Sequence, residues 1–109
     1  MRATRNIADD AMKVWRVLGR GIREAKLSNQ IAEDAGLPRE RTDVYMREIA
    51  RFLNFQGFEV VSDSCGFWKA ETPEEIEGYR ESLLGRSRSL IARCNALTTI
   101  ADRMRQKEE

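Results

Sequence analysis

The sequence predicts a mainly helical α+β fold with several short helices, one β-hairpin and a long C-terminal helix. Three observations support this prediction. Apolar residues recur at three- and four-residue steps in the first half of the chain. Two short aromatic and β-branched runs flank a polar turn in the middle. A final helical stretch after Pro73 is interrupted only by Gly78 and Gly85. We therefore expect one compact domain over residues 1–71 and a long helix over 72–109.

The composition excludes several classes of function. The chain has 109 residues, a formal net charge of +1, two cysteines and no histidine. Histidine is the commonest general base and zinc ligand, so we expect no enzyme, no catalytic residue, no metal site and no cofactor. No apolar run reaches the ~18 residues that a membrane span requires. We therefore expect no membrane partner. Two cysteines make a poor disulfide framework, so we expect a cytoplasmic protein.

The basic residues are mostly arginines. Planar guanidinium groups suit forked contacts with phosphates, with guanine edges and equally with the carboxylates of an acidic protein. The arginine bias therefore fits DNA or an acidic protein partner and does not decide between them. The near-neutral charge argues against the strongly basic domain of many nucleic-acid binders, although the position of the charges matters more than their sum.

The first helix is expected from about Asp9 to Leu18 or Arg20, and two glycines, Gly19 and Gly21, should end it. Its buried stripe recurs at helical steps and comprises Ala11, Val14, Trp15 and Leu18.

A short helix, a glycine turn and a longer helix should follow. The short helix is expected over residues 28–35, with Ser28 as the candidate N-cap, since its hydroxyl can accept an amide hydrogen. Gly36 can take the left-handed conformation that ends a helix. Pro38 suits the first turn of the next helix, which we expect to run to about Gln56. The inward face of that helix comprises Tyr45 or Met46, Ile49, Phe52 and Leu53.

A β-hairpin is expected directly after these helices. The runs 58–61 and 67–70 flank a polar turn at 62–66. The earlier segment 22–27 is either a loop or a short strand that pairs with the hairpin, which gives two or three strands in all. Trp68 is expected to pack, because large aromatics in a small sheet usually do.

The last helix should open with a capping box. Thr72 would cap it, Pro73 would take the first helical position and Glu75 would reach back to the cap.

Two interleaved sets of residues recur every seven positions along this helix. The large residues are Ile76, Leu83, Leu90, Leu97 and Met104, and the small residues are Ser87, Cys94 and Ala101. In a coiled coil they would occupy the d and a positions, and small a residues let two backbones approach closely. The stripe either packs on the first helix of the same chain or pairs with a partner helix, foremost in a homodimer.

An exposed row of charged residues is expected on the helix from Pro38 to Gln56. The row has i, i+4 spacing and comprises Arg39, Asp43, Arg47 and Arg51. It can lie along the major groove, where arginine pairs bidentately with guanine, or it can form a ladder of surface ion pairs. Val44 either contacts a thymine methyl group or is partly buried against the first helix.

Three further residues are candidates for DNA contacts. Asn29 and Gln30 start the preceding helix and can donate to a phosphate together with its N-terminal amides, or they simply face solvent. Lys69 is the basic residue of the hairpin, whose tip is acidic at Asp63.

The order of elements over 27–70 resembles winged helix-turn-helix domains. The run from Gly57 to Glu75 is similar to small phage and prophage proteins, in which a Gly-aromatic-Trp wing leads through Thr-Pro-Glu-Glu into a long arginine-rich helix. The likeness covers about four fifths of the chain. It implies that the second helix of the motif reads double-stranded DNA through Arg39, Arg41, Arg47 and Arg51.

The resemblance implies a dimeric regulator or a replication accessory. The acidic wing tip departs from the family pattern and weakens the case for phosphate contacts by the wing. Because such folds in phage proteins also bind host proteins, the alternative is a protein-interaction module. It would inhibit a host or defence complex through the same arginine-bearing face.

Overall fold

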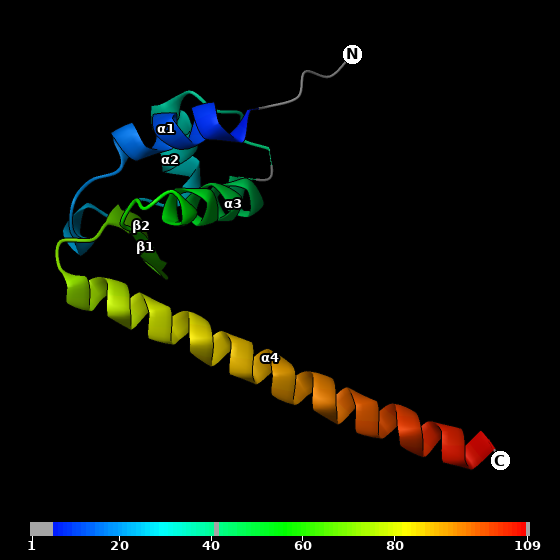
Figure 1. The fold of residues 1–109 in the computed structure, drawn as a ribbon. Helices are drawn as coiled ribbons and strands as arrows, with labels where there is room; N and C mark the ends of the chain where they lie inside the picture. Colours follow the sequence, from blue (N-terminus) through cyan, green and yellow to red (C-terminus); the bar gives the residue numbers. More distant parts are fainter. Residues whose placement is uncertain (1–5, 41, 109) are drawn as a thin grey trace. The chain divides into compact units, whose positions relative to one another are not determined.

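The computed structural model describes residues 6–40 and 42–108 (Figure 1). The elements in chain order are α1 (Ile7–Val17), the 3₁₀ helix η1 (Ile22–Glu24), α2 (Ser28–Ala35), α3 (Thr42–Phe55), β1 (Val60–Asp63), β2 (Gly66–Lys69) and α4 (Pro73–Glu108). The predicted mainly helical fold, with a small antiparallel sheet and a long C-terminal helix, is confirmed. The chain divides into two compact units, with the boundary after Ile76.

Helix α1 begins two residues before the predicted start because Asn6 is its N-cap. The Asn6 Oδ1 atom accepts hydrogen bonds from the amides of Ala8 at 3.0 Å and Asp9 at 3.4 Å. These bonds satisfy two of the amides that the first turn leaves unpaired.

Helix α1 ends at Val17, before the two glycines that were expected to end it. The Lys69 amide donates to the Gly19 carbonyl at 2.8 Å, and the Gly21 amide donates to the Lys69 carbonyl at 2.8 Å. Backbone groups committed to a strand cannot also bond within a helix, so pairing with β2 fixes the end of α1.

Helix α2 has the predicted bounds, Ser28–Ala35, but the prediction that Ser28 is its N-cap was wrong. Leu27 takes the N-cap position in an extended conformation, without a side-chain hydrogen bond, and Ser28 is buried. The reason lies one residue earlier, where Lys26 exchanges two backbone hydrogen bonds with Phe67, at 3.1 and 2.9 Å. This pairing keeps the chain extended up to the helix.

The glycine that was predicted to end α2 does so. Gly36 has φ 71° and ψ 33°, and the Leu37 amide donates to the Ala32 carbonyl at 2.8 Å. This is the Schellman closure. The same closure ends α3 at Gly57, which has φ 93°.

Helix α3 begins at Thr42, four residues after the predicted start, so Pro38 and Arg39 lie outside it. A helix starting at Pro38 would need Leu37 as its N-cap, but the α2 closure holds Leu37 in the core. The Thr42 hydroxyl instead donates to Asn29 Oδ1 at 2.8 Å, which ties the start of α3 to the start of α2.

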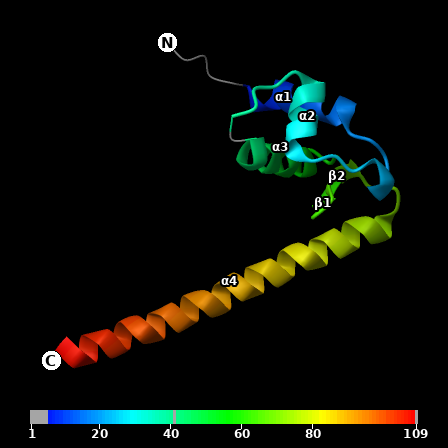
Figure 2. The ribbon, with the colours of Figure 1, turned by 180° about the vertical axis from the view of Figure 1, so that it is seen from behind.

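The first unit is built on one core where α1, α2 and α3 meet, seen from opposite sides in Figures 1 and 2. The predicted stripes of α1 and α3 both contribute to it, although Trp15 and Phe52 are only partly buried. The buried residues of this core are Ala11, Val14, Leu18, Ile31, Ala32, Leu37, Met46, Ile49, Ala50, Leu53 and Val60. Small Ala32 at zero exposure lets α2 lie close to its neighbours.

A polar contact between α1 and α3 lies beside this core and was not predicted. The Tyr45 hydroxyl donates to the carboxylate of Asp10, which is buried although it lies in the first turn of α1. Acidic residues in a first helical turn are usually solvated, so the burial of Asp10 could not be expected from its position.

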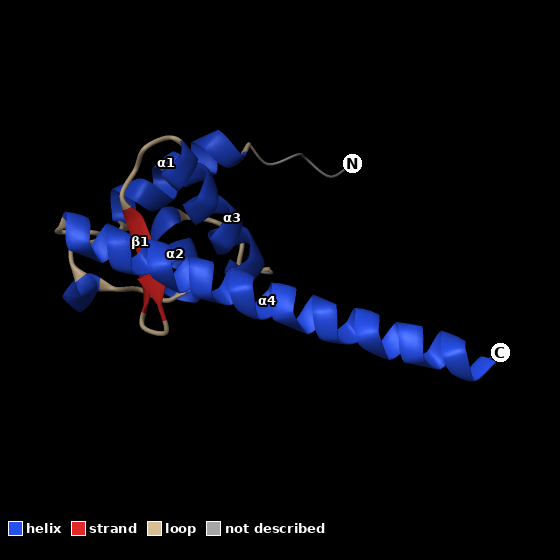
Figure 3. Ribbon diagram, turned by 60° about the horizontal axis from the view of Figure 1, so that its bottom comes forward, coloured by secondary structure: helices blue, strands red, loops and turns tan. Residues whose placement is uncertain are grey.

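The predicted hairpin is present, with a tighter turn than expected. The two strands, red in Figure 3, pair from Val60 opposite Lys69 to Asp63 opposite Gly66. Only two residues, at 64 and 65, therefore form the turn, and the Cys65 amide donates to Asp63 Oδ1 at 2.6 Å.

The segment 22–27 is neither a plain loop nor a regular strand, which were the two predicted alternatives. Isolated bridges join Lys26 to Phe67 and Arg20 to Lys69, on either side of η1, so β2 is paired on both edges. Gly66 makes this possible: its φ is 120°, and a Cβ atom there would lie 2.2 Å from the Lys26 carbonyl oxygen.

Trp68 packs as predicted, and its indole changes the expected capping box. The Trp68 side chain is buried, and its Nε1 donates to Glu75 Oε2 at 2.9 Å. Thr72 does cap α4, since its Oγ1 accepts from the Glu75 amide at 3.3 Å. The Glu75 carboxylate serves the buried indole instead of reaching back, because a buried N–H without an acceptor is costly.

The second unit is the continuation of α4, which passes through Gly78 and Gly85 without interruption and ends at Glu108. The large residues of the seven-residue repeat are exposed, with Leu90 at 62%. Among the described residues, no helix is both long enough and apolar enough to cross a membrane.

Replacing Gly66 by alanine should destabilise the first unit by at least about 2 kcal/mol, because φ 120° is strained for alanine and its Cβ meets backbone. Gly36→Ala is the matched control, with a positive φ but nothing within 4 Å, and should cost about 1 kcal/mol. Denaturant unfolding followed by tryptophan fluorescence measures both. Equal losses would contradict the close approach of Lys26.

Candidate functional site

The outward face of α3 is the most chemically varied surface of the first unit. The helix buries one side in the core and exposes the other from its first turn to its last. The exposed side chains are Asp43, Val44, Arg47, Glu48, Arg51, Asn54 and Phe55. Two arginines and two carboxylates balance in formal charge. Any binding by this face must therefore come from the placement of individual groups and not from its net charge.

Arg47 and Arg51 have the exposed, one-turn spacing that was predicted. Arg47 Nε donates to the backbone carbonyl of Asp43 at 3.2 Å, and the Arg51 guanidinium lies 5.8 Å from the centroid of the Phe55 ring. Among the described residues, neither arginine has a carboxylate partner within salt-bridge distance. Their terminal guanidinium nitrogens are therefore available for a forked contact.

The predicted row loses its first member, and the ion-pair ladder does not form among the described residues. Arg39 lies before α3, and its Nη2 pairs with Glu33 Oε2 on α2 at 2.5 Å. Asp43 meets Arg47 only through its backbone carbonyl. Arg41, the fourth predicted arginine, lies outside the described residues.

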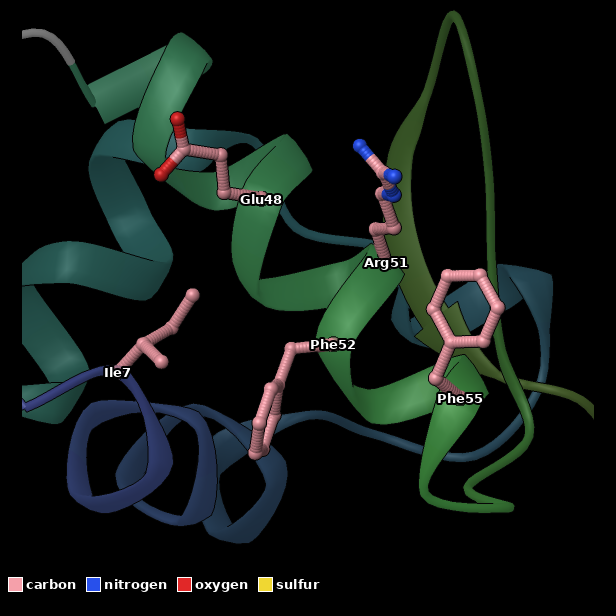
Figure 4. A pocket seen from close by; sticks show the side chains of 5 residues that line it. All are labelled: Ile7, Glu48, Arg51, Phe52 and Phe55. Carbon is pink, nitrogen blue, oxygen red and sulfur yellow. The ribbon is translucent and has the colours of Figure 1, made fainter.

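Phe55, at the end of α3, is the most exposed large apolar side chain among the described residues, at 78%. It borders a shallow surface pocket of about 370 Å³ together with Ile7, Glu48, Arg51 and Phe52. Figure 4 shows Phe52 pointing towards α1 and Phe55 pointing away from it, next to Arg51. An exposed ring beside a guanidinium can stack on a flat group or pack against a partner's apolar surface. Sequence reasoning missed Phe55.

The two predicted polar residues at the start of α2 are engaged within the fold. Asn29 accepts the Thr42 hydroxyl hydrogen bond, and Gln30 Nε2 donates to Asp34 Oδ1 at 2.9 Å. Both residues remain exposed, so each can still reach a ligand.

Asp34 collects two hydrogen bonds at the surface of α2. Lys26 Nζ donates to its Oδ2 at 2.8 Å and also donates to the Val17 carbonyl at 2.8 Å. The pKa of the Asp34 carboxyl is held below its ordinary value, chiefly by the Lys26 hydrogen bond and then by that of Gln30. Lys26 thereby links α1, α2 and, through its backbone, β2.

Val44 and Lys69 differ in their availability. Val44 is 41% exposed, so part of its side chain is open to a ligand. Lys69 is half-buried, and its Nζ lies 4.3 Å from the centroid of the Trp15 ring, so a cation–π contact directs it to the protein.

The predicted seam residues of α4 lie at seven-residue spacing on one continuous helix. Ala101 is half-buried, and the others are exposed: Leu83, Ser87, Leu90, Cys94, Leu97 and Met104.

No family model matches this chain, and no curated protein or solved structure is found to be similar to it. Among the described residues, no cluster of three metal-ligating side chains occurs either.

Asp34→Asn should lower the free energy of unfolding near neutral pH, because the folded state favours the charged carboxylate. A depressed folded pKa contributes stability above the ordinary pKa of 3.8, and this stability is lost as the pH falls through the folded value. The difference between Asp34→Asn and wild type should therefore shrink on acidification below about pH 3.8. Urea unfolding across this range measures it.

Asp43→Asn is the matched control, since it removes the same charge from an exposed carboxylate on α3. It should produce a smaller change at neutral pH. A pH-independent effect of Asp34→Asn would contradict the ionic origin of the Lys26 contact.

Proposed function

We propose that the first unit binds double-stranded DNA as a winged helix-turn-helix, with α3 in the major groove and the β1–β2 hairpin as the wing. The observation that carries this proposal is the pair Arg47 and Arg51. They are exposed, one helical turn apart and without a carboxylate partner among the described residues. Guanidinium forks at this spacing fit adjacent guanine edges or phosphates.

The arrangement of α2 and α3 supports the same assignment. The left-handed closure at Gly36 separates the two helices, and the Thr42–Asn29 hydrogen bond fixes their starts against each other. In the proposed complex, Asn29 and Gln30 contact a phosphate beside the groove. Val44 lies one helical turn before Arg47 and supplies an apolar contact to a thymine methyl group.

The remaining predicted contacts have different weights in this proposal. Arg39 reaches a phosphate only by sharing or leaving Glu33, to which it is bound. Lys69 contributes through the electrostatic field, because its ammonium group lies over Trp15. Arg41 is retained as a phosphate contact from the predicted motif. The proposed cytoplasmic protein acts as a homodimer, as a phage-type regulator or a replication accessory.

The second candidate function is a protein-interaction module that inhibits a host or defence complex. Phe55, exposed beside Arg51 and Glu48, favours it, because aromatic and arginine side chains are enriched among the anchor residues of protein interfaces. On this alternative, Phe55 is the anchor and Arg51 meets an acidic group of the partner.

Arg47→Ala and Arg51→Ala should each weaken binding to a duplex that the wild type prefers. Losing a fork on a base edge should cost about 1–3 kcal/mol and relax the preference at one position. Losing a phosphate contact should weaken binding to all duplexes alike and reduce the salt slope by about one unit. Fluorescence anisotropy titrations at several salt concentrations separate the two cases.

Arg16→Ala is the matched control, since Arg16 is an exposed arginine on α1 with the same charge. It should leave duplex affinity within about twofold. Wild-type protein without salt-dependent affinity for any duplex would overturn the DNA proposal. Phe55→Ser should retain duplex affinity, because the DNA proposal assigns Phe55 no contact, whereas it should abolish binding to a protein partner on the alternative function.

A further inference from the structure

Helix α4 exposes a long apolar face on an otherwise charged helix. Leu90 is 62% exposed and Ile91 is 59% exposed, and Leu83, Leu97 and Met104 are also exposed. A face of this length is unfavourable in water and is typical of helices that pair. The pattern of large and small residues on this face indicates which partner fits.

Parallel pairing of two α4 helices would put each residue opposite its own copy. Layers of two leucines would then alternate with layers of two small residues, such as Ser87 or Cys94. A constant helix separation would leave voids at the small layers. Arg80, which occupies the equivalent position one heptad before Ser87, would also face its own copy at the seam.

Antiparallel pairing makes the layers equal in volume. In one register, Ser87 lies opposite Leu97 of a second copy and Cys94 lies opposite Leu90. The next layer in the same register joins Ala101 to Leu83. Every small residue therefore meets a leucine, so both helices can approach closely over these layers. Arg80 then lies opposite Met104 and not opposite a second arginine.

The same register brings opposite charges together. Glu77 lies beside Arg105 of the second copy, and the twofold symmetry produces this pair twice. Arg105 Nη1 already bonds Asp102 Oδ1 on its own helix at 2.9 Å, but a guanidinium has five donors and can bond both carboxylates. On the solvated flank of the pair, Arg93 approaches its own copy. This like-charge repulsion opposes the attraction of the two Glu77–Arg105 pairs.

Polar groups near the seam are compatible with burial. Thr98, which flanks the seam opposite Leu84, donates its hydroxyl to the Cys94 carbonyl of its own helix at 3.1 Å. Covering Thr98 would therefore leave no unsatisfied donor. Ile91, which also flanks the seam, would lie next to its own copy beside the twofold axis, and the two side chains would cover each other.

We propose that α4 is an antiparallel homodimer interface in the register that places Ser87 opposite Leu97, Cys94 opposite Leu90 and Ala101 opposite Leu83. The proposal deepens the self-association in the proposed function and does not depend on DNA binding. It separates the two copies of residue 77 by about 45 Å along the helix axes. The two N-terminal units are then joined to opposite ends of the pair.

Cysteine cross-linking of the full chain tests this orientation. The background variant carries Cys65→Ser and Cys94→Ala, where alanine keeps the small size of the position. Ile91→Cys or Met104→Cys is then added, and each protein is treated with a copper oxidant or a short bis-maleimide. Non-reducing gels measure the cross-linked dimer, and light scattering checks that the background variant keeps the wild-type mass.

Ile91→Cys should form most of its product as covalent dimer, because the two copies meet at the axis. Met104→Cys should form at least about tenfold less, because its copies lie about 36 Å apart. The reverse result would establish parallel pairing and overturn the proposal. Equal linking of both variants, or a monomeric mass with neither linking, would also overturn it.

Charge reversal tests the register independently. Glu77→Arg and Arg105→Glu should each weaken the dimer roughly 3- to 30-fold, because two surface ion pairs are lost, and the double variant should recover to within about threefold. Glu81→Arg is the matched control, with the same charge change outside the seam. Additive losses in the double variant would overturn this register, whatever the duplex affinity of the proteins.

Discussion

Strand β2 is hydrogen-bonded along both edges, and the close backbone approach at Gly66 allows the second edge to form. One edge pairs with β1, and the other meets the backbone at Arg20 and Lys26. This second pairing ends α1 before the glycines and keeps the chain extended until α2 begins. It also sets where Lys26 lies, and hence its contacts with Asp34 and Val17. The end of α1 and the start of α2 therefore depend on a strand some forty residues further along the chain.

Features with a local cause could be predicted from the sequence. The apolar stripe of α3 and the closure at Gly36 need only neighbouring residues, and both were predicted. The bounds of α2 were also predicted, but its N-cap and the first residues of α1 and α3 were not. Each depends on a choice between competing partners, and for α2 and α3 that choice is made by a distant strand or by a core residue such as Leu37. Glu75 is the clearest case, because the buried indole of Trp68 takes the carboxylate that the capping box had assigned to the helix end.

The candidate site shows the same contrast between features with a local cause and features that depend on distant contacts. Arg47 and Arg51 are exposed as helical periodicity requires, because the core fixes which side of α3 faces inward. Arg39 and Lys69 differ, since their long side chains bind Glu33 and the Trp15 ring, which sequence spacing could not indicate. The exposure of Phe55 also had no sequence signal: the apolar periodicity continues to the end of α3, but the core does not.

The balanced charge of the α3 face limits what one unit can do on DNA. Affinity for a duplex grows with the number of phosphates that are neutralised. Arg47 and Arg51, which have no carboxylate partner in the described part of the chain, can neutralise few. Two linked units can bind with an effective concentration set by their connection, which raises affinity without any new contact. In the proposed function, pairing through the apolar face of α4 thus compensates for the few positive charges that α3 offers to DNA. In this proposal, a first unit that binds weakly alone becomes selective for targets that both copies can reach, and the length of α4 sets which targets those are.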